Sequence, residues 1–189
     1  MTTDMMNPGR ASRPPTRRRR TRVLAALGLL LLGIGGYAAW QAANPTVLRA
    51  EIEIAATPDE VWTVLTDQRS YPRWNPFLVS STGPLEPAAT LTNVLRGADG
   101  AEWTFTPTVL AVDPGRELRW IGRLGPGGLF DGEHAFRIVP AGPGRVRFVQ
   151  EETFRGVLVP PLSGWLTGDT LPQFRAMNAA LATEVADRR

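Results

Sequence analysis

The chain has 189 residues, enough for one domain with a sizeable core and an additional segment. Its net charge of +3 joins two unlike parts, because residues 1–44 carry seven arginines and one acid whereas residues 45–189 carry 14 arginines and 17 acids. The basic charge therefore belongs to the N-terminal part, which argues against nucleic-acid binding by the rest. The lack of cysteine excludes disulfides and thiolate sites, and a single histidine excludes a multi-histidine metal site. We therefore expect neither a metal nor a cofactor.

An apolar segment follows the arginines at positions 17–20 and 22. Residues 23–40 carry no charge, and up to Ala43 only Gln41 is polar. About 21 helical residues at roughly 1.5 Å each match the hydrocarbon thickness of a bilayer. Because arginine favours the cytoplasmic side and Tyr37 and Trp40 suit a headgroup region, we predict a single-pass signal anchor over 23–43. Its N-terminus would be cytoplasmic and its domain extracytoplasmic, in the cell membrane.

Two other interpretations of this segment compete with the anchor. A cleaved export signal needs a shorter apolar core and small residues at the cut, although the arginines loosely resemble a twin-arginine signal. A core helix of a soluble protein would show a polar face, which this run lacks. Residues 1–22, basic and poor in apolar side chains, are predicted to be a disordered tail.

Residues 45–189 begin with the alternating strand pattern "TVLRAEIEIAA" from Thr46. A helix is predicted next, with Thr57 as N-cap, Pro58 in the first turn and Glu60 completing a capping box. Prolines interrupt "YPRWNPFL", where we expect Trp74 and Asn75 to pack and cap a helix break. Five further strands are predicted, separated by Gly- and Pro-containing turns, over residues 89–96, 101–112, 116–123, 131–139 and 145–155.

A helical pattern ends the chain in "LPQFRAMNAALATEVADRR". One face of this predicted helix carries Leu171, Phe174, Asn178, Leu181 and Val185. Antiparallel strands with one long helix packed on a single face make an α+β domain.

The order of the phrases "IAATPDEVWTVLTDQRSYPRWNPFL", "LRWIGRL", "GLFDGEHAFRIVP" and "FVQEETFRGVL" resembles the SRPBCC or START-like superfamily, and within it the polyketide cyclase/dehydrase-like group. The resemblance covers about residues 46–187. It implies a helix-grip fold, in which a curved antiparallel sheet wraps around the long C-terminal helix and leaves a mostly apolar cavity. Many members of the superfamily are binding proteins and some are enzymes, so the resemblance predicts fold better than activity.

Alternation along the strands indicates which side chains face that cavity. Charged residues such as Glu117, Arg119, Glu133 and Arg137 mark the solvent side, so the residues between them should face inward. We predict that the cavity is lined by Trp103, Phe105, Leu118, Trp120, His134, Phe136, Phe148, Gln150, Phe174 and Asn178.

Symmetric turns would align Trp120, His134 and Gln150 in one row, with Glu152 two residues further along. A polar group that faces an apolar cavity must be hydrogen-bonded, so His134 should bind Gln150, Glu152 or a ligand. Three roles remain open for His134: a structural pair, a contact to a ligand carbonyl or hydroxyl, and a general base tuned by Glu152. In the last case His134 and Glu152 would be catalytic residues.

Three functions compete. The first is a membrane-anchored module that binds a small hydrophobic molecule or lipid, and it is the one we favour. The second is a cyclase or dehydratase that uses the same cavity. The third is a protein-interaction domain, as the resemblance implies for some members of the superfamily, and a cavity filled by side chains would favour it.

Overall fold

The computed structural model describes residues 18–189, and the chain divides into two compact units that part at Ala39 and Trp40. The first helix, α1 (Arg18–Ala43), is long and apolar enough to cross a membrane. It begins five residues before the end of the tail expected to be disordered, so residues 18–22 are helical, and residues 1–17 of that tail lie outside the described residues. Asn44 ends the helix, because its backbone N–H and its side-chain amide both donate hydrogen bonds to the carbonyl oxygen of Trp40, at 3.0 and 2.8 Å.

The second unit contains eight strands and several helices. In chain order they are β1 (Thr46–Ile54), α2 (Pro58–Thr66), the 3₁₀ turn η1 (Gln68–Ser70), α3 (Tyr71–Trp74), β2 (Leu78–Thr82), β3 (Thr92–Arg96), β4 (Glu102–Phe105), β5 (Thr108–Asp113), β6 (Glu117–Arg123), β7 (Asp131–Pro140), β8 (Val146–Arg155), α4 (Val159–Trp165), the π-helical turn η2 (Leu166–Thr170) and α5 (Leu171–Asp187). All strand pairs are antiparallel.

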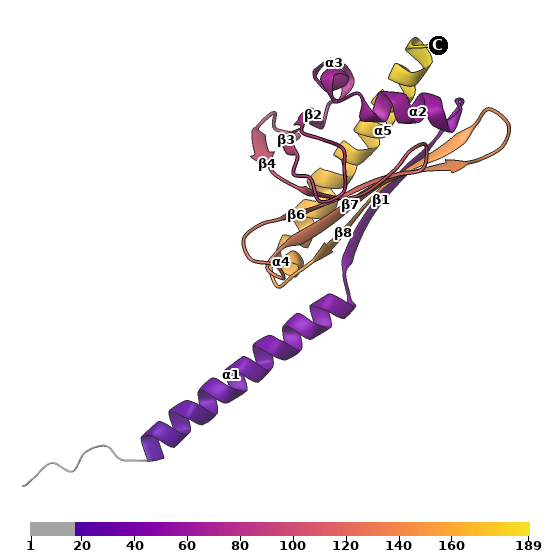
Figure 1. Cartoon of the computed structure of the whole chain (residues 1–189). Helices are drawn as coiled ribbons and strands as arrows, with labels where there is room; N and C mark the ends of the chain where they lie inside the picture. Colours follow the sequence, from indigo (N-terminus) through magenta and orange to yellow (C-terminus); the bar gives the residue numbers. More distant parts are fainter. Residues whose placement is uncertain (1–17) are drawn as a thin grey trace, which may run out of the picture. The chain divides into compact units, whose positions relative to one another are not determined.

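The strands form a five-stranded sheet in the order β1-β8-β7-β6-β5 and a three-stranded sheet in the order β2-β3-β4. Helix α5 runs across one face of the larger sheet (Figure 1) and buries Phe174, Met177, Leu181 and Val185 against it and against α2. This arrangement confirms the expected α+β helix-grip architecture. The core is continuous from the sheet through α5 to α2, whose capping box between Thr57 and Glu60 forms as predicted.

Three local expectations differ from the structure. The predicted strand over 101–112 is two strands, β4 and β5, because Pro107 has no N–H to donate and the chain passes there from one sheet to the other. Strand β2 was not predicted, since prolines precede it and its five residues are short for a periodicity signal. Helix α4 was not predicted either, because Pro160 and Pro161 read as helix breakers although both lie in its first turn, where proline is tolerated.

The two sheets meet where the segment 88–91 lies beside residues 107–109. Three backbone hydrogen bonds join them there: Ala88 N–H to Val109 O, Val109 N–H to Ala89 O, and Leu91 N–H to Pro107 O. By contrast, β7 and β8 pair over ten residues each. The junction is thus narrow, and the smaller sheet forms a separate wall over the larger one.

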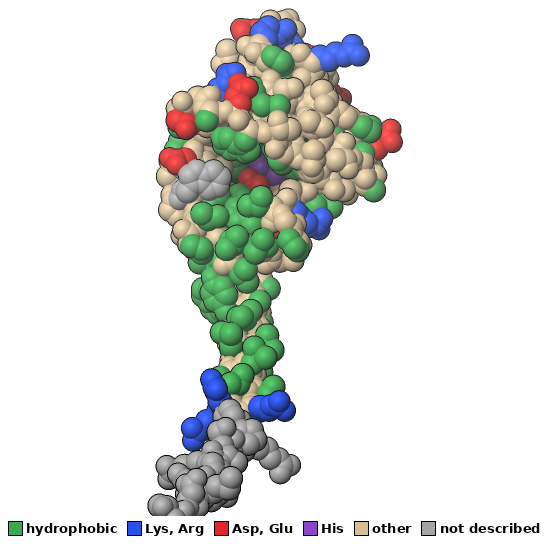
Figure 2. Space-filling model, turned by 90° about the vertical axis from the view of Figure 1, so that its left-hand side faces the viewer, with side chains coloured by type: hydrophobic (Ala, Val, Ile, Leu, Met, Phe, Trp, Pro, Cys, Tyr) green, Lys and Arg blue, Asp and Glu red, His purple; other side chains and the backbone are tan. Residues whose placement is uncertain are grey.

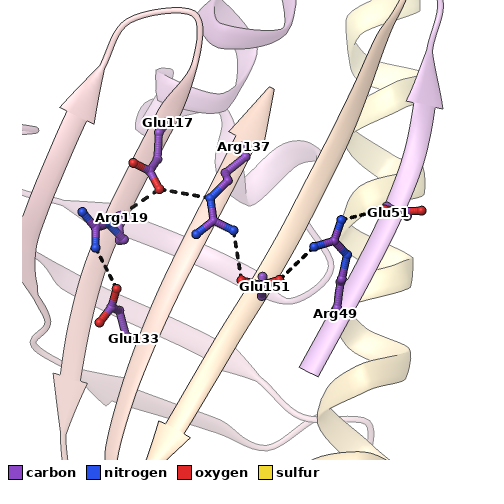
Figure 3. A network of polar contacts seen from close by, with 7 residues as sticks. All are labelled: Arg49, Glu51, Glu117, Arg119, Glu133, Arg137 and Glu151. Carbon is purple, nitrogen blue, oxygen red and sulfur yellow. Dashed lines mark hydrogen bonds and ion pairs between the residues drawn. The ribbon is translucent and has the colours of Figure 1, made fainter. Parts of the chain in front are cut away.

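The solvent face of the larger sheet carries a network of arginine and glutamate side chains that crosses four strands (Figure 3). Arg137 on β7 donates to Glu117 on β6 at 3.2 Å and to Glu151 on β8 at 3.0 Å, and Arg49 on β1 donates to the other oxygen of Glu151 at 2.9 Å. Partial burial acts to raise the pKa of Glu151, but the hydrogen bonds from Arg137 and Arg49 outweigh it, so that this pKa is lowered. The predicted solvent side of the strands is confirmed, which leaves the uncharged side chains for the face under α5.

Candidate functional site

A cavity of about 520 Å³ lies between the larger sheet, the wall formed by β2-β3-β4, and the segment from α4 to α5. This volume is within the range of roughly 300–1,000 Å³ that small-molecule sites occupy. Its walls are mainly aromatic and aliphatic, with Phe77, Leu95, Trp103, Phe105, Trp120, Phe130, Phe136, Phe154, Leu162, Leu166 and Met177 among the lining residues. The space is open to solvent on one side, and Figure 2 shows the histidine and an acidic side chain at the bottom of a hollow bordered by hydrophobic side chains.

Three polar side chains of the cavity lie together on β7 and β8. His134 is 5% exposed and Gln150 fully buried, and Glu152 joins them from the same face of β8. Nδ1 of His134 lies 3.1 Å from Oε2 of Glu152, and Nε2 of His134 lies 3.2 Å from Nε2 of Gln150. The imidazole is therefore held between two side chains of the neighbouring strand, as a buried polar group requires.

The contacts define one set of donor and acceptor roles. With the amide nitrogen of Gln150 toward Nε2 of His134, this nitrogen accepts and a ring N–H is on Nδ1. That N–H donates to the carboxylate of Glu152. Oε1 of Gln150 has no hydrogen-bond partner among the described residues. Oε1 of Gln150 is itself buried, so the carboxylate of Glu152, 17% exposed, is the acceptor of this cluster that a bound molecule can reach.

Aromatic rings enclose the imidazole of His134. Trp120 stacks on it with ring centroids 5.3 Å apart and planes 20° from parallel, Phe136 lies 4.6 Å away, and Phe174 meets it edge-on at 5.0 Å. Stacking on Trp120 and packing against Phe174 leave the ring little freedom to turn. The hydrogen-bond geometry with Glu152 is therefore held by packing as well as by the strands.

Glycines on β6 and β7 make room for the cavity at one end of the sheet. Gly122 and Gly132 are paired across the two strands and both line the space. A Cβ at Gly132 would lie 2.6 Å from Oε1 of Glu152 and 3.2 Å from the ring of Phe154, so this position admits no larger residue while the carboxylate stays in place. A Cβ at Gly122 would lie 3.4 Å from the ring of Phe105, which is an ordinary contact.

The structure brings most of the predicted site residues together. Trp103, Phe105, Trp120, His134, Phe136, Gln150 and Glu152 all border the cavity. The predicted row of Trp120, His134 and Gln150 is wrong by two residues, since the residues paired with His134 are Trp120 and Glu152, while Gln150 pairs with Phe136. The pairing of β7 with β8 is shifted by two residues from the one that a symmetric turn would give, and a shift of two keeps every side chain on its face of the sheet.

Four predicted lining residues lie in the packed core instead: Leu118, Phe148, Phe174 and Asn178. Leu118 and Phe148 are on the predicted face of the sheet but lie where helices pack on it, whereas Phe174 and Asn178 lie on α5, with Phe174 packed against His134. Asn178 is 2% exposed, and neither atom of its amide has a partner in the described part of the chain. Trp74 and Asn75 pack and cap as expected, with Oδ1 of Asn75 accepting from the backbone N–H groups of Phe77 and Leu78.

Several lining residues were not predicted. Gly132 and Phe154 lie two residues from His134 and Glu152 on the same strand faces, so the alternation that located His134 would also have found them. Other lining residues come from segments that only the fold brings over the sheet: Phe77 before β2, Leu95 on β3, Leu162 on α4 and Thr170 in η2. Within residues 18–189 no group of three or more histidine, aspartate or glutamate side chains could hold a metal ion.

Comparison with known proteins matches residues 45–186 to the family described as "Polyketide cyclase / dehydrase and lipid transport". Three similar solved structures are the ZhuI aromatase/cyclase from a Streptomyces species (TM-score 0.62, 18% identity, 77% of this chain and 96% of that chain), a START superfamily protein from Mycobacterium smegmatis (0.58, 20%, 76% and 99%) and norcoclaurine synthase from Thalictrum flavum, solved with dopamine and hydroxybenzaldehyde (0.59, 15%, 77% and 88%). At these identities the likeness shows the fold alone. No curated protein matches the sequence.

Proposed function

The chain belongs to the polyketide cyclase/dehydrase and lipid transport family, and from this premise we propose that it is a membrane-anchored module that binds a small hydrophobic molecule carrying a hydroxyl group. One observation carries the proposal: a mostly apolar cavity of about 520 Å³ has a single polar cluster at its base. Apolar walls bind by excluding water, and a few placed polar atoms orient the guest.

The chemistry of the cluster selects the polar group of the ligand. Both nitrogens of His134 are engaged and Oε1 of Gln150 is buried, whereas the partly exposed carboxylate of Glu152 can accept a hydrogen bond. A hydroxyl can donate to this carboxylate, but an ether or ketone oxygen cannot. We therefore expect phenols or alcohols with an apolar skeleton to bind better than their methyl ethers.

Binding is tested by titrating the full chain, purified in detergent micelles, with β-naphthol and with its methyl ether. Loss of one hydrogen bond to a carboxylate, about 1.5–3 kcal/mol, makes the ether roughly 10–150-fold weaker. Replacing Glu152 by Met, which keeps the length without an acceptor, should reduce this preference, while the surface change Arg145→Gln should leave it intact. Equal binding of both compounds, or no binding by a folded chain, would overturn the proposal. Native mass spectrometry of the purified chain would then identify any molecule that it carries.

The anchoring part of the proposal relies on α1. The helix satisfies the length and apolarity that a span requires, and arginines precede its apolar run. By the positive-inside rule its N-terminus would be cytoplasmic and residues 45–189 extracytoplasmic. Reporter fusions after Ala43 and protease treatment of intact cells test this orientation, and a domain protected from protease would contradict it.

A cyclase or dehydratase activity is the second candidate, and the contact between His134 and Glu152 beside the cavity favours it. In that case the geometry makes Glu152 the group that meets the substrate as base, while His134 orients its carboxylate. Once a substrate is known, Glu152→Gln should abolish turnover and His134→Gln should reduce it. Unchanged turnover in both variants would remove the pair from catalysis.

A further inference from the structure

The end of the domain at which the chain enters β1 is also one end of the cavity. Thr46, the first residue of β1, pairs with Phe154 on β8, which pairs with Gly132 on β7, and Gly132 pairs with Gly122 on β6. Phe154, Gly132 and Gly122 all line the cavity. The loops that follow this row, residues 124–130 and 156–164, border its open side through Leu124, Phe130 and Leu162. We refer to these two segments as the rim.

The rim is apolar and exposed. Leu124 is 62% exposed, Leu158 37% and Leu162 36%, and neither 124–130 nor 156–164 contains an acidic residue. The two segments are hydrogen-bonded to each other, through Val157 N–H to Gly128 O and Leu158 N–H to Leu129 O. Exposed leucines held together on one surface mark an interaction site rather than scattered surface residues.

Only a short connection separates α1 from β1. Helix α1 ends at Ala43 and β1 begins at Thr46, so three Cα–Cα steps, at most about 11 Å, separate them. Asn44 is bonded back to the last turn of the helix, and the ring of Pro45 fixes its own backbone angle φ. This greatest distance between Ala43 and Thr46 is little more than the thickness of the headgroup layer of a bilayer.

The charges beside the rim suit a bilayer surface. Arg123 and Arg155 are both exposed, and they flank Asp131 in the pairing of β6, β7 and β8, which leaves one net positive charge. Arginine beside exposed leucines is the composition of surfaces that insert into the headgroup region of anionic membranes. A protein partner would need no such proximity to the anchor.

From these observations we propose that the rim docks on the bilayer, so that the cavity opens onto the lipid phase and exchanges its ligand there instead of with the aqueous phase. This inference rests on the proposed anchor and cavity. Its occupant is the lipid surface itself, and the leucines of the rim would lie among the headgroups.

The absence of cysteine allows a direct test on the full chain. Single cysteines at Leu124, Leu162 and Arg145 are labelled with the polarity-sensitive dye NBD in vesicles of phosphatidylcholine and phosphatidylglycerol, with and without doxyl-labelled lipid as quencher. Arg145 is exposed and lies in the turn at the far end of β7 and β8, roughly 30 Å away along ten-residue strands. A fourth label at Leu30, within α1, reports insertion of the anchor.

We expect blue-shifted emission and quenching at Leu124 and Leu162 and neither at Arg145. Quenching at Leu30 with both rim labels as aqueous as Arg145 would overturn the docking while the anchor stands. A Leu30 label that is not quenched would overturn the anchor and the docking together, and β-naphthol binding in micelles would still test the cavity separately.

Ligand exchange gives a second measurement. Pyrenebutanol dissolved in vesicles should reach the cavity, read by energy transfer from tryptophan, at least fivefold more slowly in the variant Leu124→Asp/Leu162→Asp, with unchanged thermal unfolding. An unchanged rate would contradict exchange through the rim.

Discussion

Alanine at Gly132 tests whether the glycine holds open the position of the Glu152 carboxylate. The added Cβ would lie 2.6 Å from Oε1 of Glu152, closer than two such atoms approach, so the carboxylate must move. It would then lose its contact with Nδ1 of His134, now 3.1 Å long between side chains that are 17% and 7% exposed.

The magnitude follows from two opposing effects. A hydrogen bond to a charged group contributes about 1.5–3 kcal/mol, and replacing glycine by alanine within a strand returns roughly 0.5–1 kcal/mol. We therefore expect Gly132→Ala to lower the free energy of unfolding by about 1–2 kcal/mol. For a chain of this size that corresponds to a fall in Tm of roughly 2–8 °C.

The assay is thermal unfolding of the full chain in micelles, combined with NMR of the imidazole nitrogens, which is unambiguous because the chain has one histidine. The matched control is Gly122→Ala on the paired strand, where the new Cβ only touches the ring of Phe105 and the Tm should change little. In a Glu152→Ala background there is no carboxylate to displace, so Gly132→Ala should cost nothing there. An equal loss of stability in both backgrounds would refute the reasoning.

Three further predictions concern stability. A hydrogen bond from Arg188 lowers the pKa of Glu184 against the effect of burial, and hydrogen bonds from Arg137 and Arg49 likewise lower the pKa of Glu151. Since the ordinary pKa is 4.5, the stability that these two carboxylates contribute is complete above that pH and is lost as the pH falls below it. Glu151→Gln should therefore flatten the acid limb of a curve of Tm against pH. Burial raises the pKa of Tyr71 well above its ordinary 10.0, so the chain should lose stability above about pH 10. Tyr71→Phe should remove this alkaline loss of stability and lower the free energy of unfolding by about 1–2 kcal/mol, because the carbonyl oxygen of Leu65 loses its donor, now 2.5 Å away. An alkaline loss of stability that persists in this variant would contradict the assignment. Thr57→Ala should destabilise the chain by about 1 kcal/mol in urea unfolding by removing the hydroxyl that accepts from the backbone N–H of Glu60, and Thr63→Ala on the exposed side of the same helix is the control.

The sequence predicts well those parts of the fold whose signal is local. The capping box at Thr57, the strands around Trp120, His134 and Glu152 and the terminal helix each carry their own pattern of turn residues and periodicity. The face on which His134 lies follows from charged neighbours alone, because alternation along a strand does not depend on what covers the sheet.

The parts that failed depend on contacts between distant segments. Whether an inward residue borders the cavity or the core depends on where α2 and α5 touch the sheet, and this separates Trp120 from Leu118 although both have the same pattern. The pairing of His134 with Glu152 rather than Gln150 depends on the β7–β8 turn, where a change of two residues keeps the pattern intact. Strands were predicted where β3 and β4 lie, but not their separation into a wall over the cavity, since the break at Pro107 lies inside what looks like one strand.

That narrow junction also determines how large a guest the protein can accept. Three main-chain bonds near Ala88, Leu91 and Val109 tie the smaller sheet to the larger one, and β2 is held further by Leu78 in the core and by α3, whereas β4 is an edge strand with mostly exposed residues. Bulky compounds would then enlarge the cavity by displacing β4, while the polar cluster on β7 and β8 stays fixed. Such a protein discriminates strictly by functional group and leniently by bulk.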